Sequence, residues 1–186
     1  FRDLPIHRAD RNDPADIARF RKDSFRPGRT MLGSQQLADL KADLLDAQQR
    51  NLTWKFILIP EPIEHRGLMS AQDRFEGYAA ERADLLRFIE EKAISNVLFI
   101  AADIHGTLVN NITYSTTPDA PQIATHAFEV TVGPVAYYAT LGEIVIDDGI
   151  NKGYVSEAQQ QAYLALPIAP DSDNLPNDRD DFVKAI

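Results

Sequence analysis

Cysteine is absent from the 186 residues of this chain. Neither a disulfide framework nor a cysteine-bound zinc site can therefore form. Long apolar runs are absent too: the longest, Phe56–Pro60 and Val97–Ala102, have the length of buried strands, whereas a membrane helix needs roughly 20 residues. We therefore expect no membrane span. No signal peptide is visible, and because the chain opens at Phe1 without a methionine, nothing is inferred about what precedes it.

Basic residues are also in short supply. The chain has 19 Lys and Arg against 28 Asp and Glu, which gives a formal net charge of −9. Because nucleic acids are bound through clustered Lys and Arg, this balance argues against a nucleic-acid partner. A phosphate-cradling glycine loop and a Gly-x-Ser-x-Gly nucleophile motif are missing as well, which argues against nucleotide-binding and serine-hydrolase functions.

What is present is the pattern of an α/β protein. The composition is 44% hydrophobic and 25% charged, and the length suits a single globular domain, residues 1–186. Leucines at helical spacing predict a helix that Ser34 caps and that runs to about Arg50, and a second helix over Ala79–Lys92. Apolar runs predict strands at Trp54–Pro60 and Asn96–Ala102, each covered on both faces. The order of helix and buried strand favours an α/β fold.

The remaining segments are predicted with fewer signals. Residues 1–30 are expected to be mostly loop, with one short helix at Pro14–Arg21 capped by Asp13, and residues 167–186 a surface tail. Two further strands without a long helix between them indicate a mixed sheet with an antiparallel edge. Ser156 and Gln159 form a capping box for a short helix. The two further strands of the mixed sheet are predicted at Val109–Tyr114 and His126–Val132.

Asp103 and His105 are the strongest local signal for chemistry. They directly follow the second buried strand, at the carboxyl end where open α/β sheets place their ligands. Both side chains are good ligands for hard or borderline metals. From spacing alone, a structural Asp that caps the following turn beside a hydrogen-bonded His explains the pattern equally well. The position on a buried strand favours function, because a buried carboxylate without a partner is costly.

Several motifs, in order along residues 25–182, resemble those of the PhoD-like alkaline phosphatases and related phospholipases D. No single motif is decisive, but the series is hard to produce by chance. The matching segments are Arg29–Gly33 (RTMLG), Gln36-Leu37, Leu40-Lys41, Thr53–Lys55 (TWK), Asp73, Gly77-Tyr78, Glu81-Arg82, Leu85-Leu86, Asn96–His105, Phe128–Val135 and Asn177–Phe182.

This resemblance implies the fold and chemistry of a calcineurin-like metallophosphoesterase. The expected fold is two facing sheets flanked by helices, of which this chain forms the C-terminal part. Asp103 is then a metal ligand, and His105 is a second ligand or a catalytic group that hydrogen-bonds the phosphate. The resemblance also implies calcium and iron as cofactors, a phosphate ester as substrate, and a periplasmic or secreted protein.

The sequence departs from the family in ways that keep other interpretations open. The family's other metal ligands would precede residue 1, and Ala101 replaces the usual Thr before the metal loop. The N-terminal half of the same enzyme is therefore an expected partner. The alternatives are a catalytically incomplete fragment and, less favoured, a flavodoxin-like binding module without metal.

Other candidate residues carry weaker signals. Arg29 is a candidate for bidentate phosphate binding, as is Arg82, for which pairing with Glu81 or Asp84 on a helix surface is an equal alternative. The remaining candidates, for each of which an ordinary structural or surface position is the favoured interpretation, are His65, Asp73, His126 and the group Asp171, Asp173 and Asn174.

Overall fold

The computed structural model describes residues 2–68, 71–133, 141–168, 175, 177–179 and 182. The chain divides into two compact units, residues 1–133 and 134–186. Each unit is described by itself. Within the described ranges, no helix is both long and apolar enough to cross a bilayer.

Unit 1 is built around a mixed four-stranded sheet. Its strands are β1 (Lys55–Leu58), β2 (Val97–Ala101), β3 (Leu108–Tyr114) and β4 (Ile123–Thr131), in the spatial order β1-β2-β4-β3. β1, β2 and β4 run parallel, and β3 pairs antiparallel to β4 at the edge. The expected α/β class and the antiparallel edge are confirmed. The described strands form one sheet, so the second sheet of the expected sandwich stays a prediction.

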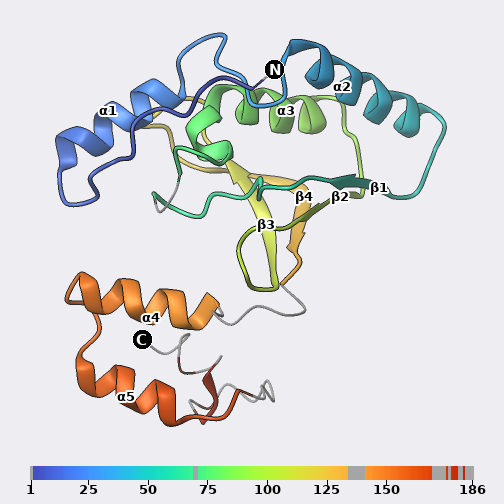
Figure 1. Ribbon diagram of the computed structural model, residues 1–186. Coiled ribbons are helices and arrows are strands. Elements are labelled where there is room, and N and C mark those ends of the chain that lie inside the picture. The colour runs from blue at the N-terminus through green and yellow to red at the C-terminus, as the bar shows by residue number, and fades with distance from the viewer. Residues whose placement is uncertain are drawn as a thin grey trace. The chain divides into compact units, whose positions relative to one another are not determined.

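Two helices, α2 (Ser34–Gln49) and α3 (Ala79–Glu91), cover one face of this sheet, and a short 3-10 turn η1 (Phe75–Tyr78) leads into α3. A third helix, α1 (Pro14–Ser24), packs on η1. Figure 1 shows α2 and α3 on the same side of the sheet, with α1 beside η1.

The helix starts are set by local hydrogen bonds, and one prediction about them is wrong. Asp13 caps α1 as expected, since its side chain accepts a hydrogen bond from the N–H of Ala15. Ser34 does not cap α2, because it is already the first helical residue and Gly33 occupies the capping position. Gly33 has a φ of 86°, a conformation that glycine adopts without strain.

The core lies between the sheet and the two helices α2 and α3. Alternate residues of each strand point toward α2 and α3, as the two-residue period of a strand requires. The buried residues of this core are Leu44, Ile57, Ile63, Phe75, Leu85, Leu86, Ile89, Ile94, Val97, Phe99, Ile112, Tyr114 and Ala127.

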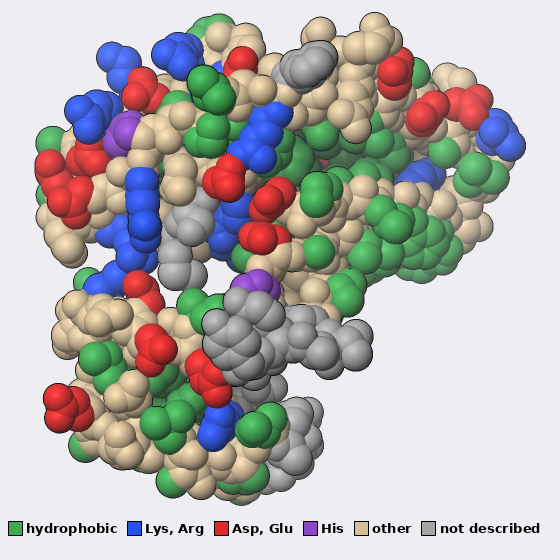
Figure 2. Space-filling view, viewed as in Figure 1, with side chains coloured by type: hydrophobic (Ala, Val, Ile, Leu, Met, Phe, Trp, Pro, Cys, Tyr) green, Lys and Arg blue, Asp and Glu red, His purple; other side chains and the backbone are tan. Residues whose placement is uncertain are grey.

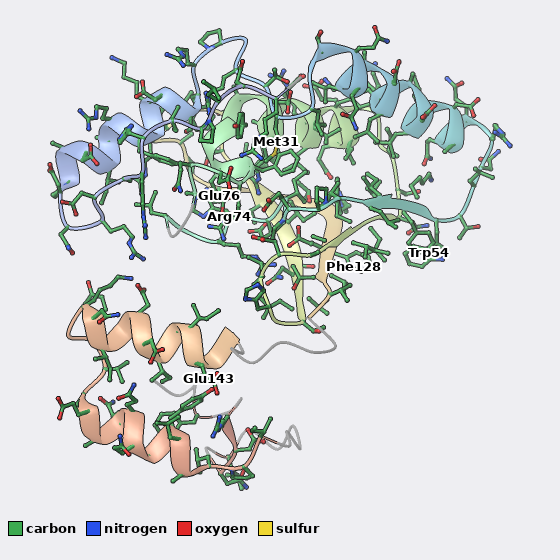
Figure 3. The ribbon with its side chains drawn as sticks, in the orientation of Figure 1. Met31, Trp54, Arg74, Glu76, Phe128 and Glu143 are labelled. Carbon is green, nitrogen blue, oxygen red and sulfur yellow. The ribbon has the colours of Figure 1, made fainter. Side chains whose placement is uncertain are left out.

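The opposite face of the sheet is apolar and exposed in unit 1. Trp54 is 50% exposed, Phe56 57% and Leu58 75%. The Trp54 ring stacks on Phe56 and meets Phe128 edge-on at a centroid distance of 6.5 Å. Figure 2 shows the hydrophobic side chains gathered over the strands, and Figure 3 places Trp54 and Phe128 on the side away from Met31. The expectation that the first strand is covered on both faces is therefore wrong for the described residues.

Unit 2 contains α4 (Leu141–Asn151) and α5 (Glu157–Ala165). The expected capping box is present: the Ser156 side chain accepts from the Gln159 N–H, and the Gln159 side chain accepts from the Ser156 N–H. Sequence patterns did not predict α4, whose β-branched residues and two glycines lower helix propensity. Packing decides instead, because Ile146 joins Val155 and Tyr163 in a small core. The Asp171, Asp173 and Asn174 group lies outside the described residues.

Candidate functional site at the carboxyl edge of the sheet

Three strands end at the same edge of the sheet because β1, β2 and β4 are parallel. Asp103 and His105 follow β2, Glu61 follows β1, and Gly133 follows β4. Asp103 is exposed and His105 is half-buried, so the sequence-based inference of a buried Asp103 carboxylate is wrong. The correct part of that inference is the position, since this edge is where an α/β sheet gathers ligand-binding side chains.

The loop that carries Asp103 and His105 has an unusual backbone. The φ angles of Asp103 and His105 are 71° and 60°, in the left-handed region, which Asp and His adopt more often than most other non-glycine residues. Residues in sparsely populated regions are often held by their surroundings and concentrate at functional sites. The contacts that hold this loop come from the end of β4.

Thr131, at the end of β4, holds that loop in place. Its hydroxyl donates to the carbonyl of Gly106 over 3.0 Å and accepts from the N–H of Leu108 over 2.9 Å. Thr131 itself is fully buried. Gly133 packs closely against the same loop, where an added Cβ would lie 3.1 Å from the Thr107 hydroxyl. The end of β4 thus fixes the loop after β2.

Glu61 forms a carboxylate pair with Asp103, and sequence analysis missed it. Partial burial, the negative charge of Asp103 and a side-chain hydrogen bond to Asp103 all raise the pKa of Glu61. The Oε2 atom of Glu61 is buried and has no hydrogen-bond partner among the described residues. The signal that would have found it is the rule applied to Asp103: a carboxylate directly after a strand that ends at this edge.

The loop from Glu61 to Arg66 is anchored on the sheet by Glu129, which lies in β4. Glu129 is completely buried and accepts hydrogen bonds from the N–H of Ile63 (2.5 Å) and of Glu64 (3.1 Å). Its other oxygen pairs with the Arg66 guanidinium at 2.7 Å. Glu129 therefore determines where the segment that carries Glu61 crosses the sheet.

A cation fits this edge, but the described residues supply only part of its shell. Two adjacent carboxylates, one with an unpartnered oxygen, repel each other unless a proton or a cation lies between them. Among the described residues, no group of three or more His, Cys, Asp or Glu side chains is close enough to hold a metal ion. The carboxylate oxygens are therefore the kind of ligand that a hard cation prefers, but the described residues supply fewer ligands than such a cation needs.

Arg29 lies in a buried hydrogen-bonded position. It is 6% exposed, its Nε donates to the Gly77 carbonyl over 2.6 Å, and its Nη2 donates to the Leu4 carbonyl over 2.9 Å. The guanidinium also lies over the Tyr78 ring, 4.3 Å from its centroid. Through these contacts Arg29 joins the N-terminal segment to η1, and its Nε and Nη2 atoms are already engaged in this structure. Phosphate binding by Arg29 stays a prediction.

Glu81 and Arg82 are buried, which corrects the expectation of a helix-surface pair. Glu81 binds the RTMLG segment: it accepts from the N–H groups of Met31 (2.9 Å) and Leu32 (3.0 Å) and from the Thr30 hydroxyl. The reason is that the first turn of α3 faces the turn before α2. Two of the motifs that carry the family resemblance thus contact each other.

Arg82, the next residue of α3, contacts the loop after β1 instead of the RTMLG segment. Its Nε donates to the Ile63 carbonyl and its Nη2 to the Thr113 carbonyl, both over 2.5 Å. Glu64 lies 3.5 Å from the same Nη2. Arg82 therefore helps to hold the loop after β1, together with Glu129.

Three weaker candidates do not join the Asp103 edge through any recorded contact. Asp73 binds Arg2 and is about half exposed. His126 is almost fully exposed, with its Nδ1 2.8 Å from Glu90 Oε2. The His65 Nδ1 accepts from the N–H of Gly67, two residues away, over 3.1 Å.

Comparisons with known proteins agree with this architecture. The PhoD-like phosphatase family matches residues 6–166. Among solved structures, one titled "Structure of PhoD" is similar with a TM-score of 0.50 and 23% sequence identity, covering 72% of this chain and 24% of that chain. At this identity the likeness concerns the fold, and this chain spans about a quarter of that chain's length. The comparison with curated proteins gave no match. Because the family match extends over most of its length, the chain belongs to the PhoD-like phosphatase family.

Proposed function

We propose that this chain forms part of a metal-dependent phosphoric ester hydrolase, of the alkaline phosphatase or the phosphodiesterase (phospholipase D) type. The observation that carries the proposal is the position of Asp103. In a chain of the PhoD-like phosphatase family, it lies at the carboxyl edge of the sheet beside a second carboxylate with an unpartnered oxygen.

The proposed roles follow from the positions of the side chains. Asp103 and His105 hold the cation, and Glu61 is positioned to add a carboxylate oxygen. The family resemblance points to calcium and iron, which supply Lewis-acid polarisation of the phosphoryl oxygens and a lower pKa for the attacking water. Thr131 and Glu129 keep the two ligand-bearing loops in place. Little covalent work remains for the protein in phosphoryl transfer, so positioning and charge are its main contribution.

The exposed apolar face supports a partner, the N-terminal part of the same enzyme. Trp54, Phe56 and Leu58 together form an apolar surface that isolated soluble domains seldom leave open. The match covers 24% of the solved chain, and the rest of that chain is long enough to contain a second sheet. We propose that this second sheet covers the face and brings the missing metal ligands to the Asp103 edge.

A specific observation favours a second candidate function. The described residues contain no group of three metal-binding side chains, although a bimetallic site needs more ligands than that. The chain is then a catalytically incomplete fragment that keeps the fold of the family without hydrolytic activity.

One experiment separates the two candidates. Calcium and iron binding is measured by calorimetry and elemental analysis, and hydrolysis is assayed with 4-nitrophenyl phosphate and bis(4-nitrophenyl) phosphate. The assays are run on this chain together with the N-terminal part of the enzyme, since that part is proposed to bring the missing ligands. We expect this assembly to bind metal and Asp103→Asn to lose both binding and hydrolysis, whereas Asp39→Asn, an exposed change on α2, leaves both intact. Absence of metal and of hydrolysis in the wild-type assembly would instead establish the incomplete fragment. Preference between the two esters decides the type of hydrolase.

A further inference from the structure

A cavity of about 410 Å³ lies in unit 1. It is formed by the last turns of α1, the loop of residues 65–68, the start of α3 and the turn between β3 and β4. None of the residues after β1 and β2 that form the candidate metal edge contributes to its wall. Its size is within the range of pockets that bind small organic molecules.

The cavity has a buried floor and an exposed rim. Phe20, Ser24, Glu76 and Arg82 form the floor and are each less than 6% exposed. Exposed polar side chains surround the mouth, and the Phe25 ring adds a second aromatic wall. The rim residues are Arg21, His65, Asp119 and Gln122.

Three side chains of this wall present hydrogen-bond donors to the cavity. Because the Nδ1 of His65 accepts from the Gly67 N–H, the neutral imidazole carries its proton on Nε2 and presents a donor. Ser115 accepts from the Gln122 amide over 2.8 Å, so its hydroxyl hydrogen is available to a ligand. Arg82 uses Nε and Nη2 for its described bonds, and its Nη1 makes none among the described residues.

The wall contains two acidic groups, Glu76 and Asp119, and Glu76 is compensated only in part, because its buried Oε2 has no hydrogen-bond partner among the described residues. Glu76 is paired with Arg74 at 3.3 Å and accepts from the Arg66 N–H. Figure 3 places the labelled Arg74 and Glu76 close to each other. Burial raises the pKa of Glu76. At His65, by contrast, partial desolvation by the surrounding atoms and the charges of Arg82, Arg74 and Arg21 lower the pKa, and Glu64 opposes them only in part. The field at the His65 side of the cavity is therefore positive.

We propose that this cavity binds a small organic anion. Its anionic oxygens are held by His65, Arg82 and Arg21, and its apolar body packs against Phe20 and Phe25. A carboxylate and a phosphate share the required chemistry, which is a planar or tetrahedral group of anionic oxygens on a compact apolar body.

The test uses the whole chain freed of metal with a chelator, so that it does not depend on hydrolysis or on the Asp103 edge. Phenylphosphonate, benzoate and inorganic phosphate are titrated separately, with binding followed by calorimetry and by amide NMR shifts. We expect saturable shifts at Phe20, Ser115 and Gln122, and about tenfold weaker binding in Arg21→Gln and in His65→Gln. The ligand that binds more tightly, phenylphosphonate or benzoate, shows whether the cavity prefers a phosphonate or a carboxylate group.

Two matched variants control for the loss of charge and of a ring. Arg87→Gln removes an exposed arginine from α3, and His126→Gln removes an exposed histidine from β4; neither residue lines the cavity. Both are expected to bind the ligand like the wild type. The proposal is overturned if neither organic anion binds at millimolar concentration, or if the shifts are confined to Glu61 and residues 103–107. Equal affinity for inorganic phosphate would overturn the role given to the two phenylalanines.

Discussion

Two glutamates in the same loop-and-sheet region of unit 1 show how differently this fold treats acidic groups. Glu129 is fully buried, and its two oxygens accept hydrogen bonds from Ile63, Glu64 and Arg66. Glu61, at the start of the loop that Glu129 anchors, faces the like charge of Asp103 and has a buried oxygen without a partner among the described residues. The strand β4 thus carries a carboxylate whose two oxygens are both hydrogen-bonded, and the loop after β1 carries one whose Oε2 is not hydrogen-bonded to any described residue.

The difference separates what holds the fold from what is available for function. A buried charge is tolerated where hydrogen bonds and an opposite charge replace its water, and Glu129, Glu81 and Arg82 meet that condition. A carboxylate pair without such partners costs stability, and groups of this kind cluster at functional sites. The unsatisfied pair at the carboxyl edge is therefore the better guide to the site, and the satisfied network explains its position.

The largest effect is expected from Glu129→Gln. This change leaves Arg66 in a mostly buried position without its counter-charge, and we expect unfolding to become easier by about 3–5 kcal/mol. Urea denaturation followed by circular dichroism measures it. Glu91→Gln, at a mostly exposed position on α3, is the control and should change stability by less than about 0.5 kcal/mol. A Glu129→Gln chain as stable as the control would contradict the anchoring role.

A smaller loss is expected from Glu81→Gln, which weakens the bonds to Met31, Leu32 and Thr30 without leaving a buried opposite charge. Hydrogen bonds to a charged group contribute about 1.5–3 kcal/mol, and the amide keeps one acceptor, so we expect a loss of about 1–2 kcal/mol. Hydrogen exchange at the amides of Met31 and Leu32 should accelerate more than in α3. Unchanged protection there would show that Glu81 does not hold the RTMLG segment.

The smallest effect, with the opposite sign, is expected from Glu61→Gln. The folded-state pKa of Glu61 is raised, so the folded protein loses stability as pH rises through that pKa. Removal of the charge should therefore stabilise the metal-free chain at pH 7 by up to about 1 kcal/mol, with no gain below the ordinary glutamate pKa. Unfolding midpoints in urea at pH 4 and pH 7 give the comparison. A loss of stability at pH 7 would mean that the carboxylate pair is not repulsive.

Much of the fold could be predicted from local signals. The helices near residues 34–50 and 79–92, the strands and the capping box of α5 follow from periodicity and capping residues, which act over a few positions. α4 escaped prediction because its β-branched residues and glycines have low helix propensity, and only its packing against Tyr163 and Val155 compensates. Ser34 was misplaced by one position because the sequence does not show the backbone angle of Gly33.

The candidate site could be predicted only in part. Asp103 and His105 stand out because they directly follow a strand, and a strand end is a local feature. Glu61 does not stand out, because its importance depends on the pairing of β1 beside β2. For Arg82, phosphate binding and a pair on the helix surface were equal alternatives, because the sequence does not show which face of α3 meets the loop after β1.

By itself, the sequence determined the α/β class, the family and the position of Asp103 after a strand, since periodicity and motif order are encoded locally. Tertiary structure decided which charges are satisfied and which are not. Glu129 and its partner Ile63 lie 66 residues apart, and β1 and β2 are joined through a whole helix. Contacts of that kind exist only after the strands have paired in register, because a side chain reaches a distant partner through the fold and not through the chain.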